Sequence, residues 1–460
     1  MAKTPIAKRD EHHELTRRAL IKWSVAAGAA LGVSRAKIFD ILERAAGKDT
    51  AFAAAENPTH RSVHIVAGNG GLAWFTSFWP HNDIAAAAPA GAAVKPGGTL
   101  VTGTDKPLTL STDAPWKTLP AQRQITAFLC GNNETHTRQP TSVTGLNGNN
   151  IFSVASALQS SSPSVIPIIT IADVDVGTAP GAARPANVGN GDGIVGLFNS
   201  AASRAGGLLS NTSDATLYKA HFDAFTQLNR AANRSTTKIA YTTASGAAKF
   251  LGTNLSAKLA IQQADLDRYM INGNTRNNVA AIGRSLIVSV KAFKMGLTNS
   301  VCLPAMDDDP HGAWDGGDIN VVPGQLQAVF NAFMTDLQNT VDDATMKSLG
   351  DDTVITVHGD TTKDPLTRGG WPDGTPGNTN TVYVYSAGDL KSGWFGSIDR
   401  TGNVKGFDAQ GNATAYNGAK TAKYAMASIA YAIAKRDDRA ISNFANGLTI
   451  SGVFGRPKDL

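Results

Sequence analysis

The sequence has few cysteines and no long apolar run. Its 460 residues include only two cysteines, Cys130 and Cys302, and their spacing matches no metal-ligand motif. In an oxidising compartment they can form a disulfide, whereas as buried side chains they stay free thiols, and the sequence leaves both alternatives open. Because no stretch of 18 unbroken apolar residues occurs, we expect no transmembrane span in the mature chain.

Charged side chains are also scarce, and they are balanced outside the first 53 residues. They make up 17% of the chain, against 42% hydrophobic residues, and the formal net charge is +5. Residues 1–53 hold ten of the 42 basic and six of the 37 acidic side chains, which leaves 32 basic and 31 acidic ones in the remainder. A nearly neutral remainder offers no basic surface to nucleic acid. We expect a folded, soluble protein.

The N-terminal segment has the pattern of a twin-arginine (Tat) export signal. Residues 16–22 (TRRALIK) contain the pair Arg17 and Arg18, and the short, mildly apolar run 23–33 follows. Such a signal is read by a receptor, and its apolar region is too short to remain in the membrane. We therefore expect a periplasmic or extracellular protein. Because residues 34–48 have the pattern of a charged amphipathic helix, cleavage is expected near 51–55, and retention of the leader is the alternative.

Short apolar runs then alternate with longer segments of helical period. Strands are expected at 62–67, 125–130, 165–171, 300–304, 353–358 and 381–386. Helices are expected at 150–159, 194–209, 215–231, 274–294, 322–341 and 415–434. Several strands are apolar on both faces, which is typical of buried parallel strands. The pattern predicts an α/β fold, a three-layer αβα sandwich around a mostly parallel sheet.

Two stretches interrupt this alternation. Residues 84–112 are rich in Ala, Gly, Pro and Thr, and residues 363–380 are crowded with Gly, Pro, Asp and Asn. Both compositions favour long loop insertions at the surface. Since no internal repeat or linker is evident, we expect the leader and amphipathic segment at 1–55 and a single α/β domain at 56–460.

Four segments in the second half of the sequence resemble a known family. They are 311–318 (HGAWDGGD), the strand 353–358 with its continuation, 368–372 (RGGWP) and 393–401 (GWFGSIDRT). With the leader, their order and spacing resemble the bacterial exported family called domain of unknown function 1501, of the alkaline-phosphatase and sulfatase-like superfamily. The resemblance extends thinly over nearly the whole chain, and it implies an alkaline-phosphatase-like sheet.

The resemblance also implies a metal site. In that superfamily, Asp and His side chains at the ends of strands hold one or two divalent metals beside a hydroxyl nucleophile. The matching ligands are His311, Asp315 and Asp318 after the strand 300–304, and His358 and Asp360 at the end of the strand 353–358. Such an oxygen-rich set suits Ca²⁺, Mg²⁺ or Mn²⁺ better than Zn²⁺. A solvated acidic loop without metal is the alternative.

The candidate catalytic residues follow the strand 125–130. Thr135 and His136 stand where the family has a Ser-His pair, and the resemblance implies an activated hydroxyl at Thr135. Neighbouring side chains of an extended segment point to opposite faces. A role in stabilising the loop is therefore the alternative for both residues.

Several charged residues of the family pattern are missing. The family's strand continues into Ser-Glu-Phe-Gly-Arg-Thr, whereas this chain has His358, Gly359 and Asp360, and the later Asp-His pair is replaced by Gly369 and Gly370. Metal sites depend on a full ligand set. We therefore expect a degenerate alkaline-phosphatase-like core that serves binding of a protein partner or self-assembly rather than catalysis. The alternative is a metal-dependent hydrolase of phosphate or sulfate esters.

Overall fold

The fold is that of a computed structural model, which describes residues 59–66, 96–100, 108–111, 113–119, 125–134, 141–162, 164–198, 250, 253–305, 321–359, 376–399, 401–446 and 448. The chain divides into two compact units. Of the described residues, the smaller unit contains 164–165, 193–198, 250 and 253–260, and the larger unit contains the rest. The single domain expected at 56–460 stays a prediction.

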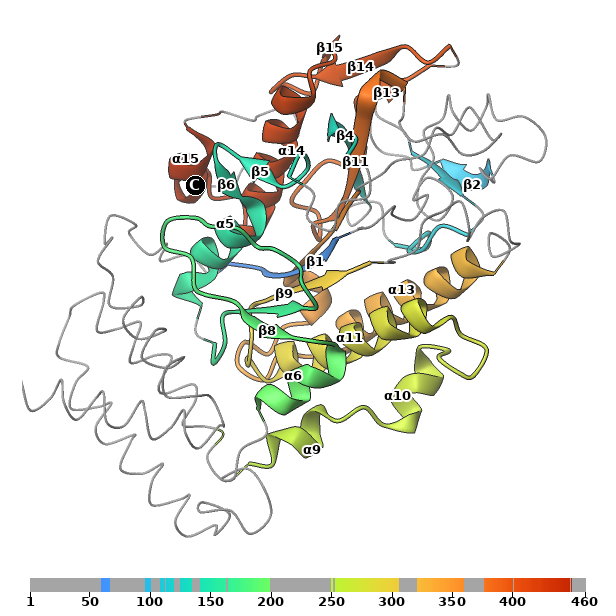
Figure 1. The fold of residues 1–460 in the computed structure, drawn as a ribbon, viewed down its shortest axis with the longest axis vertical. Coiled ribbons are helices and arrows are strands. Elements are labelled where there is room, and N and C mark those ends of the chain that lie inside the picture. Colours follow the sequence, from blue (N-terminus) through green and yellow to red (C-terminus); the bar gives the residue numbers. More distant parts are fainter. Residues whose placement is uncertain are drawn as a thin grey trace, which may run out of the picture. The chain divides into compact units, whose positions relative to one another are not determined.

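An eight-stranded sheet forms the centre of the larger unit (Figure 1). In spatial order, its strands are β12 (Gly393–Phe395), β4 (Thr126–Asn132), β11 (Thr379–Tyr385), β10 (Thr353–His358), β1 (Arg61–Val66), β9 (Ser300–Pro304), β7 (Ile168–Ile171) and β8 (Ala186–Val188). Neighbours pair in parallel except β11, which is antiparallel to both β10 and β4. The sheet is therefore mixed and mostly parallel.

The central strands are buried along their whole length. Every residue of β1 (RSVHIV), β10 (TVITVH) and β11 (TNTVYVY) is buried. β-Branched and aromatic side chains suit the pleated backbone, and their burial on both faces requires a layer of structure on each side of the sheet.

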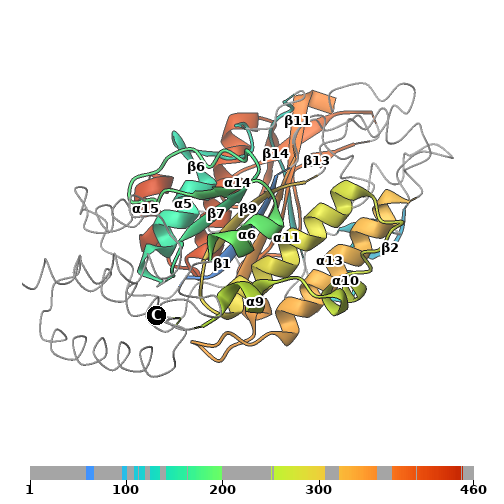
Figure 2. The same cartoon turned by 60° about the horizontal axis from the view of Figure 1, so that its bottom comes forward.

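Helices supply these two layers (Figure 2). One face is covered by α5 (Ile151–Leu158), α14 (Gly418–Ile433) and α15 (Asp438–Ala445), and the other by α11 (Asn277–Lys294) and α13 (Val322–Asn339). The alanine-rich α14 is buried on almost every side, because small side chains let it pack closely against β4. This arrangement confirms the α/β class that the alternating pattern predicts.

The other described elements are short. They are β2 (Pro96–Leu100), β3 (Thr109–Ser111), β5 (Gly145–Leu146), β6 (Asn149–Asn150), β13 (Ser397–Ile398), β14 (Val404–Phe407), β15 (Ala413–Ala415), α6 (Gly191–Leu197), α9 (Leu255–Leu259), α10 (Gln263–Arg268) and single 3-10 turns at Gln159–Ser161, Leu349–Asp351 and Pro376–Asn378. None of the described helices is long and apolar enough to cross a membrane.

The insertions differ in part from the expected loops. Residues 84–112 include the antiparallel pair β2 and β3, and the end of 363–380 already belongs to β11. Strands this short carry too few alternating residues to be recognised in a sequence rich in Ala, Gly and Pro. The helix expected at 215–231 lies outside the described residues, and that at 194–209 is described only as far as α6.

The two cysteines are free thiols on separate strands. Cys130 lies in β4 and Cys302 in β9, both completely buried, and three strands separate them. With strands about 4.8 Å apart, four spacings place the two positions about 19 Å apart, far beyond the reach of a disulfide. Burial raises the pKa of both thiols, so neither is a ready nucleophile.

Candidate functional site

The candidate site is the edge of the sheet at which the parallel strands end. β1, β4, β9 and β10 run in the same direction, so their C-terminal ends share this edge. Open α/β sheets bind ligands in the crevice outside those ends. The predicted site residues follow three of these strands in the sequence: β4, β9 and β10.

Only one of the predicted site residues can be placed. His358 is described, whereas the remaining six lie outside the described residues: Thr135, His136, His311, Asp315, Asp318 and Asp360. The Tat signal lies outside them as well. The catalytic, metal-binding and export roles of all these residues therefore stay predictions.

His358, the last residue of β10, is completely buried. Its Nδ1 lies 2.8 Å from the carbonyl oxygen of Val143, and its Nε2 lies 2.8 Å from Oγ1 of Thr356. Because a carbonyl oxygen only accepts, Nδ1 carries the proton and the Thr356 hydroxyl donates to Nε2. Burial lowers the pKa of His358 to about 4, so the ring is neutral at pH 7. Both of its nitrogens are engaged within the protein.

A second histidine, His64 of β1, joins the same network. Its Nδ1 lies 2.7 Å from Oγ1 of Thr356, and since the proton of that hydroxyl points to His358, His64 must donate. Burial, together with the electrostatic effect of nearby His358, lowers the pKa of His64 well below its ordinary value. The ring of Phe152 packs against both imidazoles, at centroid distances of 4.8 and 5.0 Å. Within the described residues, Nε2 of His64 has no hydrogen-bond partner.

Asn380 fixes the spacing between two strand ends at this edge. Its buried Nδ2 donates to the carbonyl oxygens of Asn132, at 3.2 Å, and Gly359, at 3.3 Å. Its Oδ1 accepts from the amide of Thr381, at 2.7 Å. A Cβ at Gly359 would lie only 2.3 Å from that Oδ1, so glycine is required after His358. Asn380 thereby ties the end of β4 to the end of β10 across β11.

Glu134 ties together the two flanks of segment 135–140. Its Oε1 accepts from the backbone amide of Thr141, at 3.0 Å, and from the hydroxyl of Thr141, at 2.7 Å. Its Oε2 accepts from the amide of Ser142, at 3.1 Å. A carboxylate with three donors is well satisfied, so the role of Glu134 is structural.

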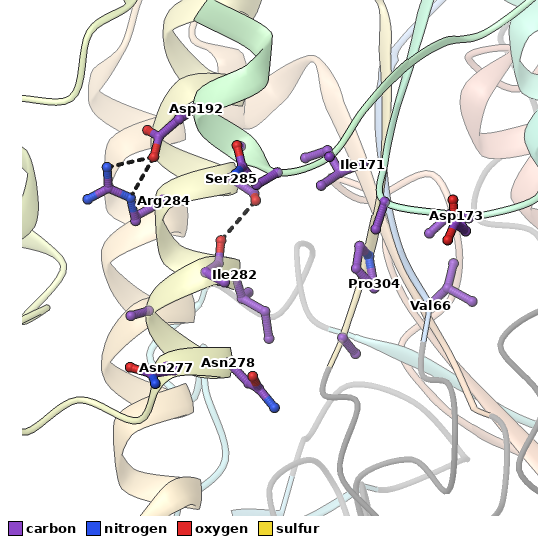
Figure 3. Close-up of a pocket in the computed structure, with 18 residues that line it drawn as sticks. Val66, Ile171, Asp173, Asp192, Asn277, Asn278, Ile282, Arg284, Ser285 and Pro304 are labelled. Carbon is purple, nitrogen blue, oxygen red and sulfur yellow. Dashed lines mark hydrogen bonds and ion pairs between the residues drawn. The ribbon is translucent and has the colours of Figure 1, made fainter.

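A pocket of about 480 Å³ lies beside the ends of β1, β7 and β9 (Figure 3). Val66, Ile171 and Pro304 belong to the strand side of this pocket, and Ile282 and Ser285 of α11 face them from the helix side. Its volume is within the range of small-molecule sites. No local sequence pattern indicates this pocket, because its walls come from segments far apart in the chain.

The polar groups of the pocket are distributed over both sides. Arg284 on α11 donates through Nε and Nη2 to Oδ2 of Asp192, at 3.1 and 2.7 Å. The side chains of Asn277 and Asn278 on α11, and of Asp173 after β7, also line the pocket. Those three side chains make no hydrogen bond or ion pair with any described residue. They are therefore available to a ligand.

The opposite edge of the sheet carries a charged cluster whose members pair with one another. His60, just before β1, lies between two carboxylates, with Nδ1 3.1 Å from Asp352 and Nε2 2.9 Å from Asp389. Arg61 and Lys435 pair with Asp352, at 3.2 and 2.5 Å. Burial alone would lower the pKa of His60, but the hydrogen bonds to the two carboxylates outweigh it and raise the pKa. This cluster holds strand ends together.

Two further findings concern metal sites and relatives. Within the described ranges, no three His, Cys, Asp or Glu side chains are grouped as ligands of a metal ion. No family model, curated protein or solved structure matches this chain. The family resemblance therefore stays a prediction.

Proposed function

We propose that the chain is an exported, extracytoplasmic binding protein with a degenerate alkaline-phosphatase-like core, and that it binds a small molecule rather than catalysing a reaction. The observation that carries this proposal is the pocket of about 480 Å³ beside the ends of β1, β7 and β9. It lies where open α/β sheets bind ligands. Export rests on the twin-arginine pattern around Arg17 and Arg18.

The environment of His358 favours binding over metal-assisted hydrolysis. Metal coordination through Nε2 would displace the donated hydrogen bond of Thr356, and coordination through Nδ1 would displace the bond to Val143. Either change would leave a completely buried polar group without a partner, which is costly. The hydrogen bonds therefore suit a structural role for this residue.

One observation favours the alternative, a metal-dependent hydrolase of phosphate or sulfate esters. β4, β9 and β10 all end at the candidate edge. The segments that follow them carry Thr135 with His136, His311 with the acidic residues Asp315 and Asp318, and Asp360. A hydroxyl nucleophile and metal ligands from separate loops would then meet, as in-line displacement requires.

Metal analysis and activity assays separate the two candidates. The purified mature protein is analysed for bound metal and assayed against a panel of phosphate and sulfate esters with added Ca²⁺, Mg²⁺ or Mn²⁺. Binding without catalysis predicts no turnover above the buffer rate. Turnover that is lost in Asp315→Ala but retained in Asp343→Ala, a change at an exposed carboxylate next to α13, would replace the binding proposal by the hydrolase.

A ligand screen tests the pocket itself. Ligand-observed NMR with a library of small organic fragments should reveal binders to the wild-type protein. Ala281→Trp places a large ring in the pocket from the exposed side of α11 and should abolish their binding. Ala344→Trp, at an exposed position away from the pocket, is the matched control and should retain it. Equal binding by both variants would contradict the proposed site.

A further inference from the structure

The connection between α14 and α15 contains two consecutive residues with a left-handed backbone. Lys435 and Arg436 have φ angles of 51° and 68°. The amide of Arg436 donates to the carbonyl oxygen of Tyr431, at 2.9 Å. The amide of Lys435 donates to the carbonyl oxygen of Ala432, at 3.0 Å, which completes a Schellman motif at the end of α14. Because a side chain disfavours the left-handed region, which glycine usually occupies here, the connection is strained.

Both left-handed residues pair with buried carboxylates at the N-terminal edge of the sheet. Nζ of Lys435 lies 2.5 Å from Oδ1 of Asp352, just before β10. Nε of Arg436 lies 3.3 Å from Oδ1 of Asp389, after β11. A strained backbone persists only where the surrounding structure fixes it. The positions of these two carboxylates therefore help to hold the connection in its strained conformation.

His60 joins the two carboxylates to each other. Its ring lies between Asp352 and Asp389, with nitrogen-to-oxygen distances of 3.1 and 2.9 Å. Its backbone amide donates to the carbonyl oxygen of Ile433, at 2.8 Å, near the end of α14. Only a protonated imidazole donates through both nitrogens. The protonated ring therefore satisfies both carboxylates, whereas a neutral ring presents a lone pair to one of them.

The charged and titratable groups around His60 come from several elements. Among the described residues, they are Asp352, Asp389, Arg61 of β1, Asp342 after α13, Tyr431 of α14, Lys435 and Arg436 of the connection, and Asp438 of α15. Burial raises the pKa of Tyr431 to about 12. Reference pKa values of aspartate, lysine and arginine side chains lie below about 4.5 or above about 10. His60 is therefore the member of this set whose charge changes between pH 6 and 9.

We infer that His60 is a pH-sensitive switch of the connection between α14 and α15: the protonated ring holds Asp352 and Asp389 in place, and loss of its proton frees one of them, so that the strained connection relaxes and α15 detaches locally. This inference is independent of the pocket and of its ligand.

The direction of the switch follows from the pKa of His60. Burial alone would lower this pKa, but the hydrogen bonds to the two carboxylates raise it. The closed conformation is therefore fully stabilised below pH 6.5 and loses this stabilisation as the pH rises through the folded pKa.

α15 is the element that depends most on this connection. It has only eight residues, and a helix of that length is not stable without packing. Its side chains Ile441 and Phe444 are buried, and the carbonyl oxygen of Phe444 accepts from Nδ2 of Asn147, at 2.5 Å. Local opening at higher pH would expose this apolar face.

Native-state hydrogen exchange followed by mass spectrometry tests the switch. The protection of residues 434–445 is measured from pH 6 to pH 9, relative to the intrinsic exchange rate at each pH. Because a hydrogen bond to a charged group changes an equilibrium by about tenfold or more, the protection of this segment should fall by about tenfold over this range. Residues 277–286 of α11, which line the pocket at the opposite edge of the sheet, are the internal control and should keep their protection.

Two variants assign the effect to the proton of His60. His60→Gln offers one donor nitrogen at every pH, so at pH 6 its segment 434–445 should already exchange as fast as that of the wild type at pH 9. Asp389→Asn supplies an amide that donates to the neutral ring and accepts from the protonated one, so its protection should no longer change with pH. Asp438→Asn is the matched control, because this exposed carboxylate on α15 makes no hydrogen bond to His60, and it should keep the pH dependence of the wild type.

Three results would overturn the inference. The first is equal protection of residues 434–445 at pH 6 and pH 9 in the wild type, and the second is a pH dependence that persists in Asp389→Asn. The third is a parallel loss of protection in residues 277–286, which would show global rather than local opening. Because none of these results depends on His60→Gln, the inference stays testable if that variant does not fold.

Discussion

Replacing His358 by glutamine should make the free energy of unfolding less sensitive to acid. The folded protein holds this imidazole neutral, with a pKa of about 4, whereas in the unfolded chain it titrates near 6.5. Because the folded pKa is depressed, the stabilisation is complete above pH 6.5 and is lost as the pH falls towards 4. A difference of about 2.5 pH units at 1.36 kcal/mol each corresponds to about 3 kcal/mol.

The assay is urea unfolding at several pH values between 7 and 4 and at constant ionic strength. At pH 7, His358→Gln should be less stable than the wild type by about 1–3 kcal/mol, because the donors and acceptors of Val143 and Thr356 are no longer all matched. Between pH 7 and pH 4 the wild type should lose about 3 kcal/mol more than the variant, so the difference in stability should vanish or change sign, since only the wild type loses stability through this residue.

A control variant separates titration from loss of packing. Thr356→Val removes the shared hydroxyl but keeps both imidazoles, so its stability should still fall between pH 7 and 4. If the curves of the wild type and His358→Gln run parallel over this range, His358 is not a buried neutral histidine and the proton assignment is wrong.

Three further predictions concern other parts of the chain. His60 has a raised pKa, so the stability that it contributes is complete below pH 6.5 and is lost as the pH rises through the folded pKa. Asp389→Asn should therefore reduce the loss of thermal stability between pH 6 and 9. Gly359→Ala forces a methyl group against Asn380 and should cost about 1–3 kcal/mol in urea unfolding, whereas Gly324→Ala, with open space around its Cβ, should not destabilise. Arg17→Lys combined with Arg18→Lys should leave the precursor in the cytoplasm, and immunoblots of periplasmic fractions that show normal export would refute the Tat assignment.

The main strands and helices of the described chain could be predicted because they are long and periodic. β9 and β10 have the expected bounds, and α11 and α13 begin or end within three residues of theirs. The edge strands β8 and β12 have three residues each, too few for a period to be recognised. The reversed direction of β11 was not predictable either, because alternation of side chains is the same in both directions.

The contacts of the candidate site could not be predicted, because they depend on the order of strands. His64 and Thr356 are 292 positions apart, and they meet only because β1 and β10 pair in parallel. A single histidine within the apolar run of β1 gives no hint of its partner. Asp173 and Asn278 likewise share a pocket although nothing in their local sequence connects them.

The polar side chains at the N-terminal edge of the sheet are paired with one another, whereas several of the described ones at the C-terminal edge are not, and this difference bears on function. At the N-terminal ends of β1 and β10, the buried carboxylates of Asp352 and Asp389 are matched by His60 and nearby cations. Pairing of this kind satisfies the groups internally, so that edge has little to offer a ligand. At the C-terminal edge, Asp173 and Asn278 line a pocket without a partner among the described residues. Side chains without an internal partner exchange only water for a ligand, so the proposed binding function assigns the ligand to the C-terminal edge.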